Sequence, residues 1–110
     1  MWSEDNDKIL EILNCIYTSE AVFPVICPVC GKREGHIYMH EYAGSVRGGL
    51  WLWCSACHHS SHSSYRIPFW WKNLEIIDES RLVSNPDYLE RNKTDIDNWV
   101  TALKADHRGG

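Results

Sequence analysis

The chain has 110 residues, 44 % of them hydrophobic and 24 % charged, and its formal net charge is −4 at pH 7. This length predicts a single domain over residues 1–110 with a core of modest size. No apolar run approaches the roughly 20 residues that span a bilayer, and no basic, apolar leader opens the sequence. We therefore expect a cytoplasmic protein that does not enter membranes.

Residues 3–20 predict an N-terminal helix. One side of this segment carries apolar residues at helical spacing, Ile9, Leu10, Ile12, Leu13, Ile16 and Tyr17, and the opposite side carries Lys8, Glu11 and Asn14. The acidic residues that precede them suit the positive end of a helix dipole. The periodicity therefore indicates an amphipathic helix with one apolar face.

Two cysteine pairs stand out in the middle of the chain. They are Cys27-Pro28-Val29-Cys30 and Cys54-Ser55-Ala56-Cys57, separated by residues 31–53. Thiolates two positions apart on a tight turn can reach one metal ion, and two such turns supply the four sulfurs that tetrahedral Zn²⁺ prefers. Gly31 fits the first turn, because such turns need a residue that tolerates positive φ. The spacing predicts one structural Zn²⁺ bound by Cys27, Cys30, Cys54 and Cys57.

Other uses of these cysteines are open at this point. Disulfides require an oxidising compartment, to which nothing in the acidic N-terminus directs the chain. A thioredoxin-like redox pair would account for only one of the two pairs, whereas an iron–sulfur cluster could use the same four thiolates. His58, His59 and His62 follow the second pair. We expect them at the surface, although one of them could replace a cysteine as a ligand or bind a partner.

Three strands are predicted around the cysteine pairs. Polar and apolar residues alternate over residues 36–42 and 50–53, glycines at 44–49 supply a turn between them, and a third short strand is expected at 63–67. The order along the chain is therefore turn, strand, hairpin, strand, turn, strand.

This layout resembles a zinc ribbon over residues 25–67, on the strength of Cys27-Pro28-Val29-Cys30-Gly31 and Cys54-Ser55-Ala56-Cys57. The resemblance implies a bound zinc ion and a three-stranded antiparallel sheet. It implies little about function, since zinc ribbons occur in transcription factors, ribosomal proteins, enzymes and docking modules. The expected fold class is α+β, a three-stranded antiparallel zinc ribbon flanked by an N-terminal helix and C-terminal helices.

Residues 68–106 predict a helical C-terminal part. Pro68-Phe69-Trp70-Trp71 is expected to close the sheet onto the helices. Asn85 before Pro86 is typical of a helix start, and this helix should extend to about Arg91. Thr94 with Asp97 resembles a capping box and predicts the start of the last helix.

Catalysis is not expected. Four cysteines complete a zinc coordination shell, and structural zinc sites are closed, whereas catalytic sites keep an open position. The sequence contains no P-loop, dinucleotide fingerprint, HExxH motif or nucleophile elbow. The chain is therefore predicted not to be an enzyme.

Aromatic residues suggest a binding face. The chain has six tryptophans, and Trp, Tyr and Arg are the residues enriched at interface hot spots. The simpler interpretation is that the tryptophans of the ribbon cover the sheet. The functional interpretation predicts a partner-binding face made of Tyr38, Tyr42, Arg47, Trp51 and Trp53.

Two functions compete on this basis. The first is a protein-binding module, in a specific version an acidic immunity or antitoxin-like inhibitor of a basic toxin domain. The alternative is a nucleic-acid-binding, transcription-associated ribbon, because residues 27–72 carry five basic and two acidic side chains. Four thiolates and one Zn²⁺ together carry two negative charges, which removes most of that excess. The charge therefore favours a protein partner.

Overall fold

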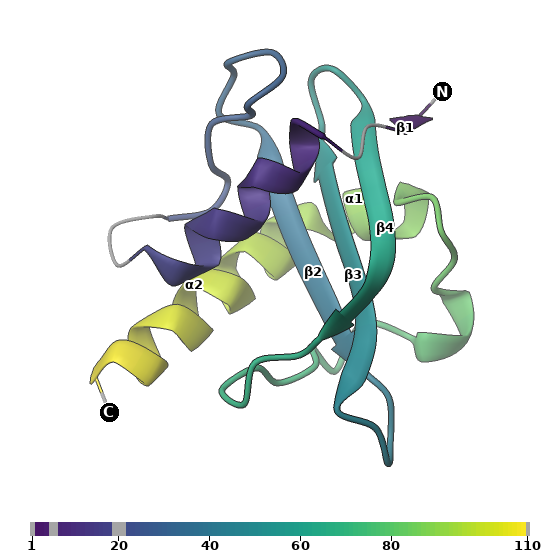
Figure 1. The fold of residues 1–110 in the computed structure, drawn as a ribbon, viewed down its shortest axis with the longest axis vertical. Helices are drawn as coiled ribbons and strands as arrows, with labels where there is room; N and C mark the ends of the chain where they lie inside the picture. The colour runs from purple at the N-terminus through teal and green to yellow at the C-terminus, as the bar shows by residue number, and fades with distance from the viewer. Residues whose placement is uncertain (1, 5–6, 19–21, 110) are drawn as a thin grey trace.

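In a computed structural model, the structure describes residues 2–4, 7–18 and 22–109. Its strands are β1 (Ser3–Glu4), β2 (Gly35–Glu41), β3 (Arg47–Cys54) and β4 (His59–Arg66), in the sheet order β1-β4-β3-β2. The neighbours β2, β3 and β4 run antiparallel, whereas β1 pairs parallel to β4 (Figure 1). The α+β class is confirmed, but the sheet is mixed and four-stranded, so the prediction of three antiparallel strands is wrong.

The extra strand comes from residues predicted to be helical. The backbone N–H of Ser3 donates to the carbonyl of His58 at 2.8 Å, and Ser3 and Glu4 pair with His59 and Ser60. The amide groups of this segment are therefore satisfied by a distant part of the chain, which overrides the local helical signal.

The predicted helix over residues 3–20 is shorter and more tightly wound in the structure. It is the 3₁₀ helix η1 (Ile9–Tyr17), in which Ile9, Ile12 and Ile16 are buried. Residues 5–6 and 19–20 of the prediction lie outside the described residues. A spacing of three or four residues between the isoleucines suits a 3₁₀ helix as well as an α-helix, so their burial was predicted correctly. Leu10 and Tyr17, which the prediction placed on the same face, are exposed.

Strands β2 and β3 are buried on both faces of the sheet, whereas much of β4 is exposed. Alternation along β2 and β3 places Ile37, Met39, Leu50 and Leu52 on one face, and a Cβ added to Gly35 on that face would lie 3.0 Å from Ile12 of η1. The opposite face carries His36, Tyr38, His40, Trp51 and Trp53. Figure 1 shows η1, in purple, across one face and the long C-terminal helix beyond the other.

The C-terminal part covers the aromatic face, and only its second half is helical. After β4 the chain is irregular apart from the short 3₁₀ helix η2 (Glu79–Arg81), and then forms α1 (Asp87–Arg91) and α2 (Lys93–Gly109). The helical prediction for the stretch before α1 is therefore wrong. The hydroxyl of Tyr38 and the indole N–H of Trp51 bond to backbone groups of that stretch, so its amides are used in tertiary contacts.

Helix α1 starts one residue later than predicted, with Pro86 and not Asn85 at its N-cap, and the predicted start of α2 is also wrong. The side chain of Asn85 accepts a hydrogen bond from the N–H of Asp87 at 2.9 Å, and α1 ends at Arg91. Helix α2 already begins at Lys93, so Thr94 lies within it. Asp97 is buried against the sheet and does not cap the helix. Within the part of the chain that the structure describes, no helix has both the length and the apolar character needed to cross a membrane.

The close pairing of β2 and β3 predicts a strong effect of Gly48→Ala. A Cβ at Gly48 would lie 2.0 Å from the carbonyl oxygen of His40, a backbone atom that cannot move without breaking the sheet register. We expect Gly48→Ala to lower the free energy of unfolding by about 3 kcal/mol, measured by urea denaturation. Ser63→Ala, at an exposed position of β4, is the control and should change it little. Equal stabilities for the two variants would contradict the packing.

Candidate metal centre

The four cysteines predicted as ligands come together at one end of the sheet. The Sγ atoms of Cys27 and Cys57 are 3.8 Å apart, those of Cys30 and Cys54 are 3.7 Å apart, and all four lie within 4.8 Å of one another. Cys27 and Cys54 are buried, whereas Cys30 is exposed. This arrangement can bind one metal ion between the two loops.

The two loops have related backbone conformations. In the first, the N–H of Gly31 donates to the carbonyl of Cys27 at 2.8 Å; in the second, the N–H of His58 donates to the carbonyl of Cys54 at 3.0 Å. The residue after each pair has positive φ, +79° at Gly31 and +59° at His58. Glycine adopts this conformation freely, whereas histidine does so at a cost. The ring of Trp2, 4.8 Å away, packs against His58 and helps to hold it there.

Backbone N–H groups point at two of the sulfurs. Val29 donates to the Sγ of Cys27 at 3.3 Å, and Ala56 and Cys57 donate to the Sγ of Cys54 at 3.3 and 3.5 Å. Hydrogen bonds of this kind favour the thiolate, which is the form that binds metals. The turns therefore place the sulfurs and also stabilise their charged state.

At the second loop, burial disfavours the charged thiolate form of the cysteines. It raises the pKa of the Cys54 and Cys57 thiols, whereas the backbone N–H of Lys32 lowers the pKa of Cys30. Buried thiols need a nearby cation to ionise, since a low-dielectric surrounding penalises the charged form. A divalent metal ion supplies that cation, so the donor set fits a metal and would not be stable as four free thiolates.

The histidines that follow the second pair do not join this cluster, which among the described residues consists of the four cysteines alone. The ring of His62 lies on Trp51, 4.5 Å between centroids, and its Nδ1–H donates to the carbonyl of Leu50 at 3.2 Å. The replacement of a cysteine ligand by one of these histidines is therefore not supported.

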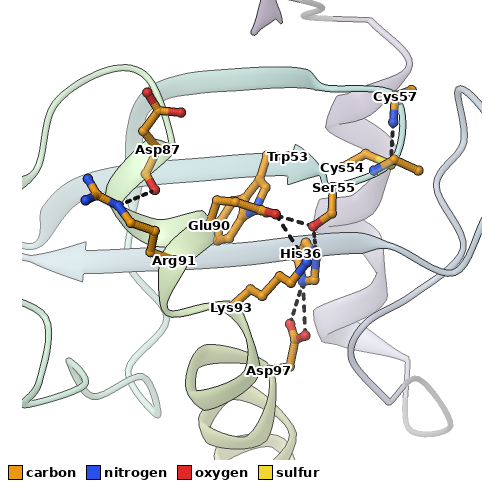
Figure 2. Close-up of polar contacts among 11 residues, drawn as sticks. His36, Trp53, Cys54, Ser55, Cys57, Asp87, Glu90, Arg91, Lys93 and Asp97 are labelled. Atoms are coloured by element: carbon orange, nitrogen blue, oxygen red, sulfur yellow. Dashed lines mark hydrogen bonds and ion pairs between the residues drawn. The ribbon is translucent and has the colours of Figure 1, made fainter. Parts of the chain in front are cut away.

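A buried polar network, missed by the sequence analysis, connects the second loop to the C-terminal helices (Figure 2). The hydroxyl of Ser55 lies 2.7 Å from Nε2 of His36 and donates to Oε1 of Glu90 at 2.7 Å. Nδ1 of His36 lies 2.8 Å from the carboxylate of Asp97. Trp53 donates its indole N–H to Glu90 at 3.0 Å. The network joins β2, β3, α1 and α2 next to the cysteines.

Ser55, His36 and Asp97 are spaced like the catalytic triad of a serine hydrolase, but the proton of Ser55 is directed elsewhere. The Glu90 carboxylate can only accept, so the single hydroxyl proton of Ser55 points to Glu90, and the serine oxygen accepts from His36. Burial would raise the pKa of Glu90, but hydrogen bonds from Ser55, Lys93 and Trp53 outweigh it and hold the pKa below its usual value. His36 therefore cannot take a proton from Ser55, as a general base must.

His36 and Asp97 form a pair that is shielded from water. Their side chains are 1 % and 8 % exposed. Burial raises the pKa of Asp97, and the hydrogen bond and charge of His36 act in the opposite direction. Each residue thus satisfies the polar atoms of the other inside the core. Histidine at a buried strand position and aspartate beside the apolar stripe of α2 are the signals in the sequence from which the pair could have been suspected.

The predicted partner-binding face is largely wrong. Tyr38, Trp51 and Trp53 are 0 %, 2 % and 0 % exposed, because the segment after β4 and helix α1 cover them. Tyr42 and Arg47 are exposed, at the far end of the sheet from the cysteines. The three large aromatic residues therefore form the core, as the simpler interpretation had it.

Comparison with known proteins finds no matching family model, and neither a curated protein nor a solved structure matches the chain. The fold and the site define a mixed α+β protein in which a cluster of four cysteines can bind one metal ion at one end of a four-stranded sheet.

Proposed function

We propose that the cysteine cluster binds one Zn²⁺ with a structural role. A tetrahedral zinc ion with Zn–S bonds of about 2.3 Å separates its sulfurs by about 3.8 Å. Two of the Sγ–Sγ distances, 3.7 and 3.8 Å, equal that separation. An iron–sulfur cluster distributes its thiolates over more than one iron, which favours wider spacing. All-sulfur ligation by two short loops is typical of structural zinc.

The zinc protein proposed here is not an enzyme. Four thiolates complete the coordination shell, so a bound zinc ion would have no position for water or substrate. The neighbouring Ser55 is engaged with Glu90 and His36, and His36 is buried. Both groups that could have suggested chemistry at this end of the molecule therefore have structural roles.

The chain instead acts by binding another protein, and one observation carries this proposal. Phe69 is 90 % exposed, and beside it Val46 and Tyr17 are 64 % and 58 % exposed. Together with Ile67, Pro68 and Trp70 they line a groove with a volume of about 600 Å³ at the end of the sheet away from the cysteines, and Glu41 and Arg66 add one charge of each sign to its lining. Exposed apolar side chains gathered in this way mark protein interaction sites. We refer to this surface as the Phe69 groove.

Charge indicates the kind of partner. The chain has a formal net charge of −4, and zinc bound by four thiolates adds two further negative charges. An acidic protein associates fastest with a basic one, because opposite fields steer the encounter. The proposed partner is therefore a protein with a basic surface and an apolar side chain that fits the groove, as an immunity or antitoxin-like protein would require.

Phe69→Ser tests this proposal. We expect affinity capture from the native host with the wild-type chain to recover a basic protein, and Phe69→Ser to weaken its binding at least tenfold, because central aromatic residues contribute most of an interface's energy. Val83→Ser, which changes a 56 % exposed side chain outside the groove, is the matched control. Recovery of the same partner with equal affinity by Phe69→Ser would refute the groove as the binding site.

A further inference from the structure

A second, more polar hollow lies on the aromatic face between the ends of β3 and β4. It has a volume of about 310 Å³ and is lined by Tyr42, Arg47, Gly49, His62, Ser63 and Ser64, with Ser45 at the preceding turn. This is at the lower end of the range for small-molecule sites. None of its lining residues is acidic, whereas the Phe69 groove contains Glu41. We call it the Arg47 pocket.

The guanidinium of Arg47 is held in place at this pocket. Its Nε donates to the hydroxyl of Ser64 at 3.1 Å, and one Nη donates to the carbonyl of the same residue at 3.4 Å. Two contacts to one residue order a side chain that would otherwise be mobile, and they leave further N–H donors for a ligand. The guanidinium of Arg47 is therefore held in a fixed position and still has N–H groups that can donate to a ligand.

The strand register places a second arginine opposite the first. Arg47 pairs with Arg66 across β3 and β4, and like charges at directly opposed positions are destabilising. Within the described ranges, neither arginine forms an ion pair. An anion bound at Arg47 would offset this repulsion, so the site has an electrostatic reason to bind one.

Further donors surround the same hollow. The Nδ1–H of His62 is committed to the carbonyl of Leu50, so in the neutral imidazole Nε2 is an acceptor and not a donor. Stacking on Trp51 fixes the plane of that ring. The hydroxyls of Ser45, Ser63 and Ser64 add donors along the rim. A fixed guanidinium with several hydroxyls suits the many acceptor oxygens of a phosphate group.

An aromatic ring completes the set. Tyr42 lines the pocket and is 38 % exposed, and exposed aromatic rings beside basic residues stack on nucleobases. From this juxtaposition we infer that the Arg47 pocket binds a nucleotide unit, with its phosphate on Arg47 and its base against Tyr42. The unit can be a free mononucleotide or part of a single strand, and both present the same chemistry.

Nuclear magnetic resonance titration of the full, metal-loaded chain tests this inference. The probes are inorganic phosphate, adenosine 5′-monophosphate, a six-nucleotide single-stranded RNA and a phosphoserine peptide. We expect the mononucleotide or the RNA to shift the amide signals of Gly48 and Gly49 and the side-chain signals of Arg47 and His62, with inorganic phosphate binding more weakly at the same place. Stronger binding of the RNA would identify a strand as the source of the nucleotide unit.

Two variants make the test specific. Arg47→Gln should reduce the affinity of the tighter nucleotide probe roughly tenfold or more, because a charge-assisted hydrogen bond is lost. Arg91→Gln removes the same charge from an exposed position at the end of α1 and should leave the affinity unchanged. Shifts confined to other residues, equal effects of the two variants, or binding of the phosphoserine peptide but of neither nucleotide probe would each overturn the assignment.

Discussion

Cys54→Ser is expected to abolish metal binding and to unfold the chain at room temperature. Cys54 is fully buried. Its Sγ accepts hydrogen bonds from two backbone N–H groups and lies 3.7 Å from the Sγ of Cys30. Serine is a poor zinc ligand, and structural zinc contributes on the order of 10 kcal/mol in small modules. Domains of this size are stable by only about 5–15 kcal/mol in total, so the loss should exceed what the remaining core can offset.

The measurements are the metal content per chain by elemental analysis and thermal unfolding followed by circular dichroism. Wild type should contain one zinc ion per chain and melt cooperatively, and a chelator should reproduce the effect of the substitution. Cys15→Ser is the matched control, since Cys15 is half-buried on η1 and lies outside the cluster. A Cys54→Ser variant with one metal ion per chain and an unchanged melting temperature would show that the cluster is not the metal site.

Asp97→Ala is expected to produce the second-largest loss, about 3–5 kcal/mol in the free energy of unfolding. It removes the partner of His36, which is 1 % exposed and cannot be solvated where it lies. Breaking a buried pair costs more than the pair contributes, because the remaining group is left without a partner. The metal content should stay at one ion per chain, because no sulfur is lost.

Two further variants separate this mechanism from a general weakening of α2. Asp97→Asn keeps a hydrogen-bonding group next to His36 and should recover part of the stability. Asp95→Ala removes an exposed acid from the first turn of the same helix and should cost at most about 1 kcal/mol. Urea denaturation of the metal-loaded proteins gives all three values. Equal losses for Asp97→Ala and Asp95→Ala would show that the His36–Asp97 pair contributes nothing specific.

The burial of the aromatic residues has a consequence for function. Trp51 and Trp53 donate their indole N–H groups to Val83 and Glu90, so they attach the C-terminal part to the sheet. The hollows around Phe69 and Arg47 lie at the opposite end of the sheet from the cysteines. In the proposed scheme the metal holds one end of the sheet together, and binding takes place at the other.

Local sequence was sufficient for the ligands and most of the elements. Two CxxC turns and a glycine at positive φ specify a metal-binding geometry within a few residues, so Cys27, Cys30, Cys54 and Cys57 could be predicted to converge. Alternation predicted β2 to within one residue at each end, but only residues 50–53 of β3, because residues 47–49 were assigned to the turn. The apolar spacing predicted the burial of the isoleucines of η1. In each case the determining interaction joins residues that are close along the chain.

Only the tertiary structure decided what covers each face of the sheet. Alternation distinguishes two faces but does not say whether water or another segment lies against them, so Tyr38, Trp51 and Trp53 could not be assigned to the core beforehand. The same holds for β1, whose pairing depends on the carbonyl of His58, and for the network of His36, Ser55, Glu90 and Asp97. These contacts join residues tens of positions apart, and they exist only because folding places polar groups where water cannot satisfy them.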